Sequence, residues 1–325
     1  MKGMIPITES IAWLRRARRA IPKEHRRVLL NPVRLAMRFL GFAALRVAHR
    51  DHGRISDDVS ARDPELVDLF CEGVRILSRS YFRLRTEGVE HVPAVGPVLL
   101  VGNHSGALVP TEGFFTAQAI RDAQGPTRAL YALVHDFIFE DPLLHDYAAR
   151  LGMLRASHAS ARHALDAGHC VLVYPGSDHD VFRPFRDRHK VVLAGRKGFL
   201  KLALQTGVPI VPVVTVGTHE QLIVLTRGDR LAKLVHAHAW ARADVFPVVL
   251  SFPWGLTSGF LPYVPLPTQV TQAFCPPMRW PHLGPAAASD PTALERCYRE
   301  VEAVMQSTLD RLAVGRRFLR GRATP

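Results

Sequence analysis

Short runs of aliphatic and β-branched residues alternate with helix-forming segments in the middle of this 325-residue chain. The runs that fit strands are 98–101, 129–134, 170–174 and 208–216, and the segments that fit helices are 111–123, 159–167 and 196–206. Such short, fully apolar runs are typical of strands buried on both faces, and regular alternation with helices makes those strands parallel. The sequence therefore predicts an α/β fold with a mostly parallel central sheet flanked by helices.

Further helices are predicted on both sides of this region. Asn31-Pro32, Asp63-Pro64 and Asp290-Pro291 each place a capping residue before a proline, which suits the first helical position. They predict helices over 33–48, from 64 to about 83, and from 291 to about 314. We therefore divide the chain into an N-terminal helical region, 1–85, and an α/β domain, 86–325.

Residues 10–22 are expected to form an amphipathic helix. At 100° per residue, the apolar side carries Trp13, Leu14, Ala17 and Ile21, and arginines occupy the other side. One interpretation is an anchor that lies in a membrane surface, with its arginines on lipid phosphates. The alternative is a helical pair that packs on the protein core and exposes a solvated basic face.

Basic charge is concentrated at the two ends of the chain. Residues 1–50 hold twelve Lys or Arg and two acids, and residues 311–325 hold five Arg and no acid. The remainder has twenty-five basic and twenty-seven acidic residues. A nucleic-acid enzyme usually spreads basic charge over its main domain, whereas basic ends on a near-neutral body fit an anionic membrane surface. We expect a membrane partner and no nucleic acid.

The sequence shows neither a secretory signal nor an apolar run of the roughly 18 residues that a membrane-spanning helix needs. Its longest uncharged run, Val245–Met278, contains seven prolines, so we expect it to lie on the protein or at the membrane interface. The four cysteines lack metal-type spacing and fit reduced thiols. These features favour a peripheral or monotopic protein on the cytoplasmic face of the cell membrane, with no metal.

Polar groups follow two of the predicted strands. Gly102-Asn103-His104-Ser105-Gly106 comes after the strand at 98–101, and a segment beginning Pro175-Gly176 comes after the strand at 170–174. Because the carboxyl ends of parallel strands share one edge of a sheet, both loops should meet there. A histidine between glycines at this edge fits a general base that a substrate can approach closely. Taken alone, a single histidine in such a loop is more often structural than catalytic.

Four blocks of the chain together resemble the glycerolipid acyltransferase family, which includes the lysophosphatidic acid acyltransferases. The blocks are Asn103-His104, a glycine at 152, the Pro175-Gly176 turn and the strand at 208–213, in the family's order. The resemblance covers residues from about 90 to 280. It implies the family's α/β fold and acyl transfer to a lipid hydroxyl.

The first block of the family is Asn-His, four further residues and an aspartate, but Val109 stands at the acidic position here. The nearest carboxylate is Glu112, which would lie about 12 Å from His104 along a continuous helix. Gly106 and Pro110 oppose such a helix, so we expect a loop that folds Glu112 back onto His104. The resemblance then implies that His104 and Glu112 are the catalytic pair.

His135 and Glu140 also have the spacing of the family's first block. His135 lacks the preceding asparagine and the glycines, and its segment resembles the linker before the family's second block. We keep His135 as the alternative catalytic histidine.

The second and third blocks depart from the family. The glycine at 152 matches, but His158 replaces the arginine that binds an acceptor phosphate, with Arg155 and Arg162 as nearby substitutes. The usual Pro-Glu-Gly-Thr-Arg is replaced from 175 by Pro-Gly-Ser-Asp. Both departures resemble the branch that acylates neutral alcohols such as diacylglycerol. The substrate-binding residues implied are Asn103, Ser105, Gly106, His158, Gly176, Ser177, Asp178, Asp180, Arg183 and Lys197.

The implied mechanism is direct acyl transfer without an acyl-enzyme. His104 removes the proton of the acceptor hydroxyl as it attacks the thioester of acyl-CoA or acyl carrier protein, and Glu112 orients the imidazole. Backbone N–H groups of Gly176 and Ser177 would stabilise the oxyanion. No cofactor is needed, and the absence of a G-x-S-x-G elbow disfavours a covalent hydrolase. A non-catalytic lipid-binding protein that kept the fold is the alternative.

Overall fold

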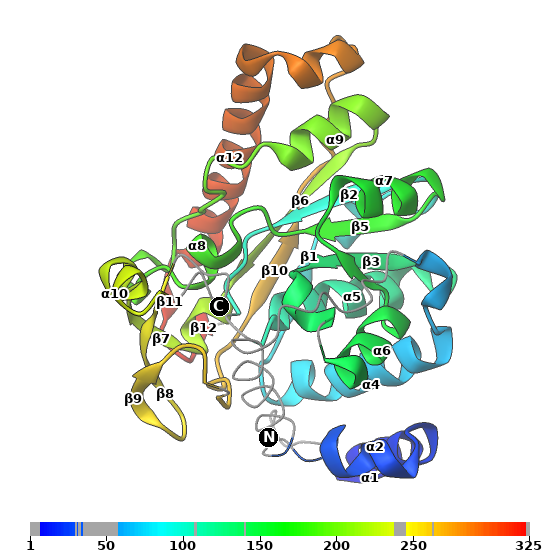
Figure 1. Ribbon diagram of the computed structural model, residues 1–325, viewed down its shortest axis with the longest axis vertical. Helices are drawn as coiled ribbons and strands as arrows, with labels where there is room; N and C mark the ends of the chain where they lie inside the picture. The colour runs from blue at the N-terminus through cyan, green and yellow to red at the C-terminus, as the bar shows by residue number, and fades with distance from the viewer. Residues whose placement is uncertain are drawn as a thin grey trace.

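A seven-stranded sheet forms the centre of the computed structural model, which describes residues 7–29, 31, 34, 58–106, 109–139, 141–236, 245–261 and 263–322. Its strand order is β1-β10-β6-β2-β5-β3-β4 (Figure 1). All neighbouring strands in it are parallel except β10 and β6. The predicted mostly parallel α/β sheet is therefore confirmed. The strands are β1 Arg85–Glu87, β2 Val98–Gly102, β3 Leu130–Val134, β4 Met153–Arg155, β5 Cys170–Val173, β6 Ile210–Val216 and β10 Thr271–Phe274.

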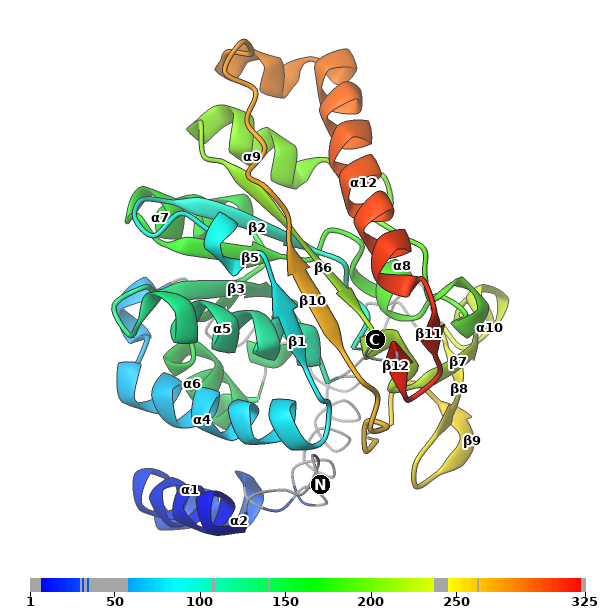
Figure 2. The same cartoon turned by 180° about the vertical axis from the view of Figure 1, so that it is seen from behind.

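Strand β2 lies in the middle of the sheet and is buried throughout. Its side chains alternate between two hydrophobic clusters: Leu99 and Val101 face one, and Val98 and Leu100 face the other. The first cluster is covered by α7 (His158–Asp166), α9 (Gly198–Thr206) and α12 (Pro291–Ala313), and the second by α5 (Thr111–Gln124). Helices α4 (Pro64–Ser80) and α6 (Pro142–Arg150) lie on the α5 side (Figure 2).

The capped helices begin where the sequence predicts. Asp63 accepts hydrogen bonds from the first-turn N–H groups of α4, and Asp290 does the same for α12. The predicted helix over 33–48 lies outside the described residues. The elements that sequence patterns did not predict are α2 Lys23–Leu29, β1, α6, β4, α8 Ser177–Val181, β7 Ile223–Thr226, α10 Asp229–Leu234, β8 Val248–Ser251, β9 Gly255–Ser258, β10, β11 Arg316–Arg317 and β12 Gly321–Arg322.

The uncharged segment after 245 contains β-strands in spite of its prolines. Strands β8 and β9 pair as a hairpin, and β7 joins β8 to make a separate three-stranded antiparallel sheet. Pro247 and Pro253 fall outside the strands, where a missing N–H removes no ladder hydrogen bond.

The N-terminal helix α1 (Ile7–Ala20) packs on α4 through most of its predicted apolar side. Trp13 Nε1 donates to the carbonyl of Leu69 at 2.8 Å, and Ala17 and Ile21 are buried. The body of the protein therefore covers Trp13, Ala17 and Ile21, whereas Leu14 of the same side stays 46% exposed. Contact of the N-terminal helices with a membrane stays a prediction. Within the described residues, no helix is long and apolar enough to cross a membrane.

Candidate active site

Asn103 continues the pairing of β2 with β6 beyond the end of β2. Its side-chain amide donates to the Thr215 carbonyl at 2.9 Å and its Oδ1 accepts the Thr215 N–H at 2.8 Å. The side chain is fully buried and both of its polar atoms bond Thr215, so the structure gives it a structural role, and its predicted substrate contact stays a prediction. Asn103 instead fixes the start of the loop that carries His104.

Glu112 lies in the first turn of α5, and its carboxylate is enclosed by the loop before it. Oε1 contacts His104 Nδ1 at 2.5 Å and accepts the N–H groups of Ser105 and Gly106 at 3.0 and 3.1 Å. A Cβ on Gly106 would lie 2.3 Å from Glu112 Oε2, so only glycine fits there. The predicted fold-back of Glu112 onto His104 is present in the structure. Ser105 and Gly106 hold the carboxylate and are not placed as substrate ligands.

The Glu112 carboxyl is fully buried, which by itself opposes ionisation. The hydrogen bond and charge of His104 and the N–H of Ser105 outweigh burial and hold the pKa of Glu112 below its usual value. An ionised carboxylate thus faces Nδ1 of the imidazole. Nε2 is then the nitrogen left to exchange a proton with a substrate.

Tyr174 stacks on the His104 ring, a contact that the sequence analysis missed. The ring centroids lie 4.7 Å apart with an interplanar angle of 25°. A Cβ on Gly102 would lie 2.3 Å from the Tyr174 ring, so the glycine before Asn103 admits this stacking. Tyr174 directly follows β5, the strand next to β2, so its position at the end of a neighbouring strand could have indicated that it lies near His104. One face of the imidazole is thereby fixed, and 20% of the His104 side chain stays exposed.

Asp180 and Arg183 form a buried ion pair beneath the backbone of His104. Asp180 Oδ2 accepts the His104 N–H at 2.5 Å, and Arg183 Nη1 donates to the His104 carbonyl at 3.3 Å and to Asp180 Oδ1. The Asp180 side chain is fully buried and that of Arg183 is 3% exposed. Both side chains are enclosed and hold the two peptide groups of His104, so the structure gives them a positioning role. Their contact with substrate stays a prediction.

The turn that contains Gly176 and Ser177 is also structural. The Ser177 N–H donates to the Tyr174 carbonyl at 3.3 Å, which removes it as the predicted oxyanion donor. A Cβ on Gly176 would lie 2.0 Å from the Val192 carbonyl oxygen, so glycine allows this close packing. The oxyanion role of Gly176 stays a prediction. Asp178 Oδ1 lies 3.5 Å from Nη2 of Arg196, a residue just before α9.

His158 and Lys197 gather around the N-terminus of α9. His158 opens α7 with an exposed side chain, and its Nε2 would lie 3.1 Å from a Cβ on Gly198. Lys197 forms a 2.7 Å ion pair with Glu295 of α12. Their predicted contact with substrate stays a prediction.

The alternative pair at 135–140 is not assembled by any described contact. Glu140 lies outside the described residues, and Asp136 pairs with Arg155 at 3.1 Å. His135 therefore stays a prediction, whereas His104 has an observed carboxylate partner.

Two further contacts join the loop that carries His104 to the segments that follow β6 and β9. Ser105 Oγ pairs with Thr218 Oγ1 of the loop after β6. The Tyr263 hydroxyl donates to the Gly106 carbonyl at 2.7 Å. Thr218 and Tyr263 are both far from His104 in the sequence, so motif spacing could not predict these contacts.

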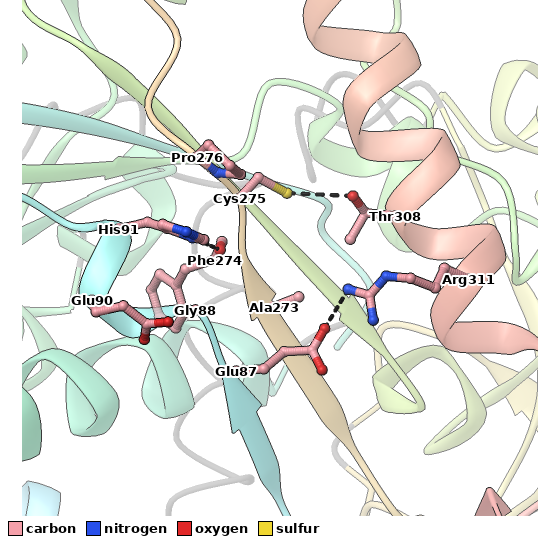
Figure 3. A pocket seen from close by; sticks show the side chains of 10 residues that line it. All are labelled: Glu87, Gly88, Glu90, His91, Ala273, Phe274, Cys275, Pro276, Thr308 and Arg311. Atoms are coloured by element: carbon pink, nitrogen blue, oxygen red, sulfur yellow. Dashed lines mark hydrogen bonds and ion pairs between the residues drawn. The ribbon is translucent and has the colours of Figure 1, made fainter.

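A cleft of about 410 Å³ lies apart from this loop, between β1, β10 and α12 (Figure 3). Its polar side chains pair with their surroundings: Glu87 with Arg311, Cys275 with Thr308, and His91 with the Phe274 carbonyl. In the described part of the chain, no three His, Cys, Asp or Glu side chains are grouped to hold a metal ion.

We expect Arg183→Met to lower the free energy of unfolding by about 3–5 kcal/mol, because it leaves the Asp180 carboxyl buried without its cation. Burial already raises the pKa of Asp180 to about 6, so its contribution to stability is lost as the pH rises from about 4 through 6. In Arg183→Met this loss should continue above pH 6. Denaturant unfolding measured from pH 5 to 8 tests both effects.

The control is Arg155→Met, whose partly exposed pair with Asp136 should contribute no more than about 1 kcal/mol. Equal losses in the two variants, or the same pH dependence as the wild type in Arg183→Met, would contradict the account of Asp180.

Comparison with known proteins identifies the family of the chain. The sequence pattern of the diacylglycerol acyltransferase family matches residues 81–265, more than half of the chain. An uncharacterised protein of Mycobacterium leprae is 33% identical over 244 residues, which cover 75% of this chain and 64% of that protein, just under two thirds of its length.

A diacylglycerol O-acyltransferase 1 of Eremothecium gossypii is 28% identical over 183 residues, or 52% of this chain and 38% of that one. The solved 1-acyl-sn-glycerophosphate acyltransferase of Thermotoga maritima gives a TM-score of 0.48 at 16% identity, covering 87% of this chain and 97% of that one. On the family match over residues 81–265, the chain belongs to the diacylglycerol acyltransferase family.

Proposed function

We propose that this protein transfers a fatty acyl group from a thioester donor to the hydroxyl of a lipid. The observation that carries the proposal is the buried, ionised Glu112 on Nδ1 of a partly exposed His104. A carboxylate in this position fixes the tautomer with an unprotonated Nε2 and stabilises the imidazolium that forms when Nε2 takes a proton.

In the proposed reaction the acceptor hydroxyl oxygen attacks the thioester carbonyl carbon while His104 Nε2 takes the hydroxyl proton. The tetrahedral intermediate then breaks its C–S bond, and the imidazolium returns the proton to the leaving thiolate. Ester and thiol are the products. Acyl-CoA and acyl carrier protein both supply this thioester, and no cofactor takes part.

A neutral acylglycerol is the proposed acceptor. The three nearby cations that could bind an acceptor phosphate already have carboxylate partners: Arg155 with Asp136, Arg162 with Asp166, and Lys197 with Glu295. His158 stands where a phosphate-binding arginine is expected. The diacylglycerol acyltransferase named among the relatives supports the same substrate class.

The alternative is a lipid-binding protein without turnover. The features that support it are the valine at 109 in place of the expected acid and the departures of the second and third blocks from the family. Glu112 supplies a carboxylate to His104 from three residues further along, which favours catalysis.

We expect His104→Ala to reduce acyl transfer by a factor of about 10²–10⁴, because the general base is lost. Glu112→Gln should reduce kcat strongly as well, since an amide neither fixes the tautomer nor stabilises the imidazolium. Transfer of labelled acyl groups from acyl-CoA measures both. His163→Ala, which removes an exposed histidine of α7, is the control and should behave as the wild type.

His104→Ala activity within about threefold of the wild type would move the active site to His135. No transfer by the wild type from either acyl-CoA or acyl carrier protein would favour the lipid-binding alternative.

We expect monoacylglycerol and diacylglycerol to be acylated at least as fast as lysophosphatidic acid, because the neighbouring cations are already paired. Competition between the acceptors at equal concentration is the measurement. A clear preference for lysophosphatidic acid would contradict a neutral acceptor and direct attention to Arg155 and Lys197.

We further propose that the N-terminal helices bind an anionic membrane surface. Ile11 and Leu14 of α1 line a groove of about 540 Å³, together with Arg15, Arg18, Arg26 and Arg27. Apolar side chains ringed by arginines match the acyl chains and phosphates of a bilayer surface.

We expect the triple variant Arg15→Gln/Arg18→Gln/Arg27→Gln to bind vesicles containing phosphatidylglycerol on the order of 100-fold more weakly at low salt, at about 1 kcal/mol for each arginine. Flotation with vesicles measures the effect. The matched control replaces Arg162, Lys201 and Arg296, exposed cations on other helices, with glutamine. Equal losses in both variants would mean that net charge, and not α1–α2, accounts for binding.

A further inference from the structure

The two faces of the β7-β8-β9 sheet have different surroundings. Val224 of β7 and Val249 of β8 are buried in a cluster with Phe182 and Tyr263. They are paired across the strands, so this face packs against the protein. The sheet projects from the body at one end of the molecule (Figures 1 and 2).

The opposite face carries an apolar row that the register aligns. Ile223 pairs with Leu250, and Leu250 pairs with Leu256, so these three side chains lie side by side across the sheet. Leu250 is 46% exposed and Leu256 is 68% exposed. Phe252 and Trp254, in the connection between β8 and β9, are 62% and 54% exposed. The outer face, as we call this surface, is formed by these five residues.

This composition does not suit a face turned to water. An antiparallel sheet normally presents polar side chains on its solvated face, and an edge strand such as β9 is normally protected by charge. Here residues 245–278 contain no charged side chain. Eight of the fifteen large apolar side chains that are exposed in the described part of the chain belong to 225–264. Such a patch marks a contact surface.

We propose that the outer face of the β7-β8-β9 sheet lies in the interfacial layer of a lipid bilayer. Tryptophan is the side chain most typical of that layer, and Trp254 stands at the end of the hairpin. Beside the sheet, α10 exposes Arg230 and Lys233 next to Leu234. Among the described residues of α10, the acid Asp229 already pairs with Arg227 at 2.6 Å, and anionic headgroups are suitable partners for the two exposed cations.

The position of the outer face agrees with a common membrane plane. The sheet and α1 lie at the same end of the long axis of the molecule in both views (Figures 1 and 2). Helix α1 exposes Ile7 and Ile11 there. The inner face meanwhile reaches the catalytic loop, since the Tyr263 hydroxyl donates to the Gly106 carbonyl. A bilayer on the outer face therefore lies one sheet away from the loop that carries His104.

Membrane contact by the outer face does not depend on the proposed reaction. Its test is binding of the full chain to vesicles of pure phosphatidylcholine at high salt, where attraction of the arginines is screened. Leu250→Ser/Leu256→Ser should weaken this binding roughly tenfold or more, because two apolar side chains leave the interface. The control is Val95→Ser/Val314→Ser, which replaces two exposed valines elsewhere and should bind as the wild type.

Fluorescence gives a second readout. Phosphatidylcholine brominated on its acyl chains should quench the wild type, and the difference between wild type and Trp254→Phe should show that Trp254 carries much of this quenching. Quenching that is the same in Trp254→Phe, binding that is the same in the leucine variant, or no binding of the wild type to phosphatidylcholine would each overturn the proposal. So would a lipid-free dimer that the leucine variant converts to a monomer, since the outer face would then join two copies.

Turnover on detergent-dispersed substrates separates this inference from the proposed function. Loss of vesicle binding with unchanged turnover in detergent supports the outer face as a membrane contact. Absence of turnover in every variant, including the wild type, would count against the proposed reaction and leave the binding result intact.

Discussion

The buried carboxylate of Glu112 is the group around which the catalytic loop is built. One of its oxygens contacts His104 Nδ1 and accepts the N–H groups of Ser105 and Gly106, so three successive residues are oriented by one atom. A buried charge is tolerated only when it is paired and hydrogen-bonded, and the contacts of the loop supply these partners to Oε1, while Oε2 is buried without a hydrogen-bond partner. Folding of this loop and orientation of the imidazole are therefore the same event.

The backbone of His104 is held independently of its ring. Asn103 extends the pairing of β2 with Thr215 of β6, and Asp180 and Arg183 bind the N–H and carbonyl groups of His104. Tyr174 then fixes one face of the ring. Groups held from several sides lose little entropy when the reaction begins, which is the physical basis of preorganised catalysis. Asp180 and Arg183 thus position His104 through its backbone.

The sequence was sufficient for the four central strands β6, β2, β5 and β3, which show as apolar runs, but not for β1, β10 and β4 at the edges of the sheet. The His104–Glu112 contact followed from local residues together with the family resemblance. Buried strands show as apolar runs, and Gly106 and Pro110 exclude the helix that would separate His104 from Glu112. The position of Asp180 and Arg183 could not be derived, since polar residues on a loop have no periodicity that distinguishes a buried pair from a substrate contact. The surroundings of α1 could not be derived for a similar reason: amphipathicity shows that a helix has an apolar side but not whether α4 or lipid covers each part of it.

The β7-β8-β9 sheet raises the same question as α1, namely whether protein or lipid covers an apolar surface. For α4-facing residues of α1 the answer is protein, and for the outer face of the sheet we propose lipid. In the uncharged segment after 245, β8 carries apolar side chains on both faces, so it lacks the alternation of apolar and polar residues that predicts a strand. The prolines around it also disfavour that prediction. Only the register separates Val249, which packs inward, from Leu250, which is exposed beside Leu256. Because successive strand residues point to opposite faces, a single short strand can stabilise the region next to the catalytic loop and still present an apolar surface outward. Leu250 and Leu256 of the outer face stay 46% and 68% exposed, and exposed apolar patches of this kind mark contact surfaces, which supports the proposal that lipid contacts this face.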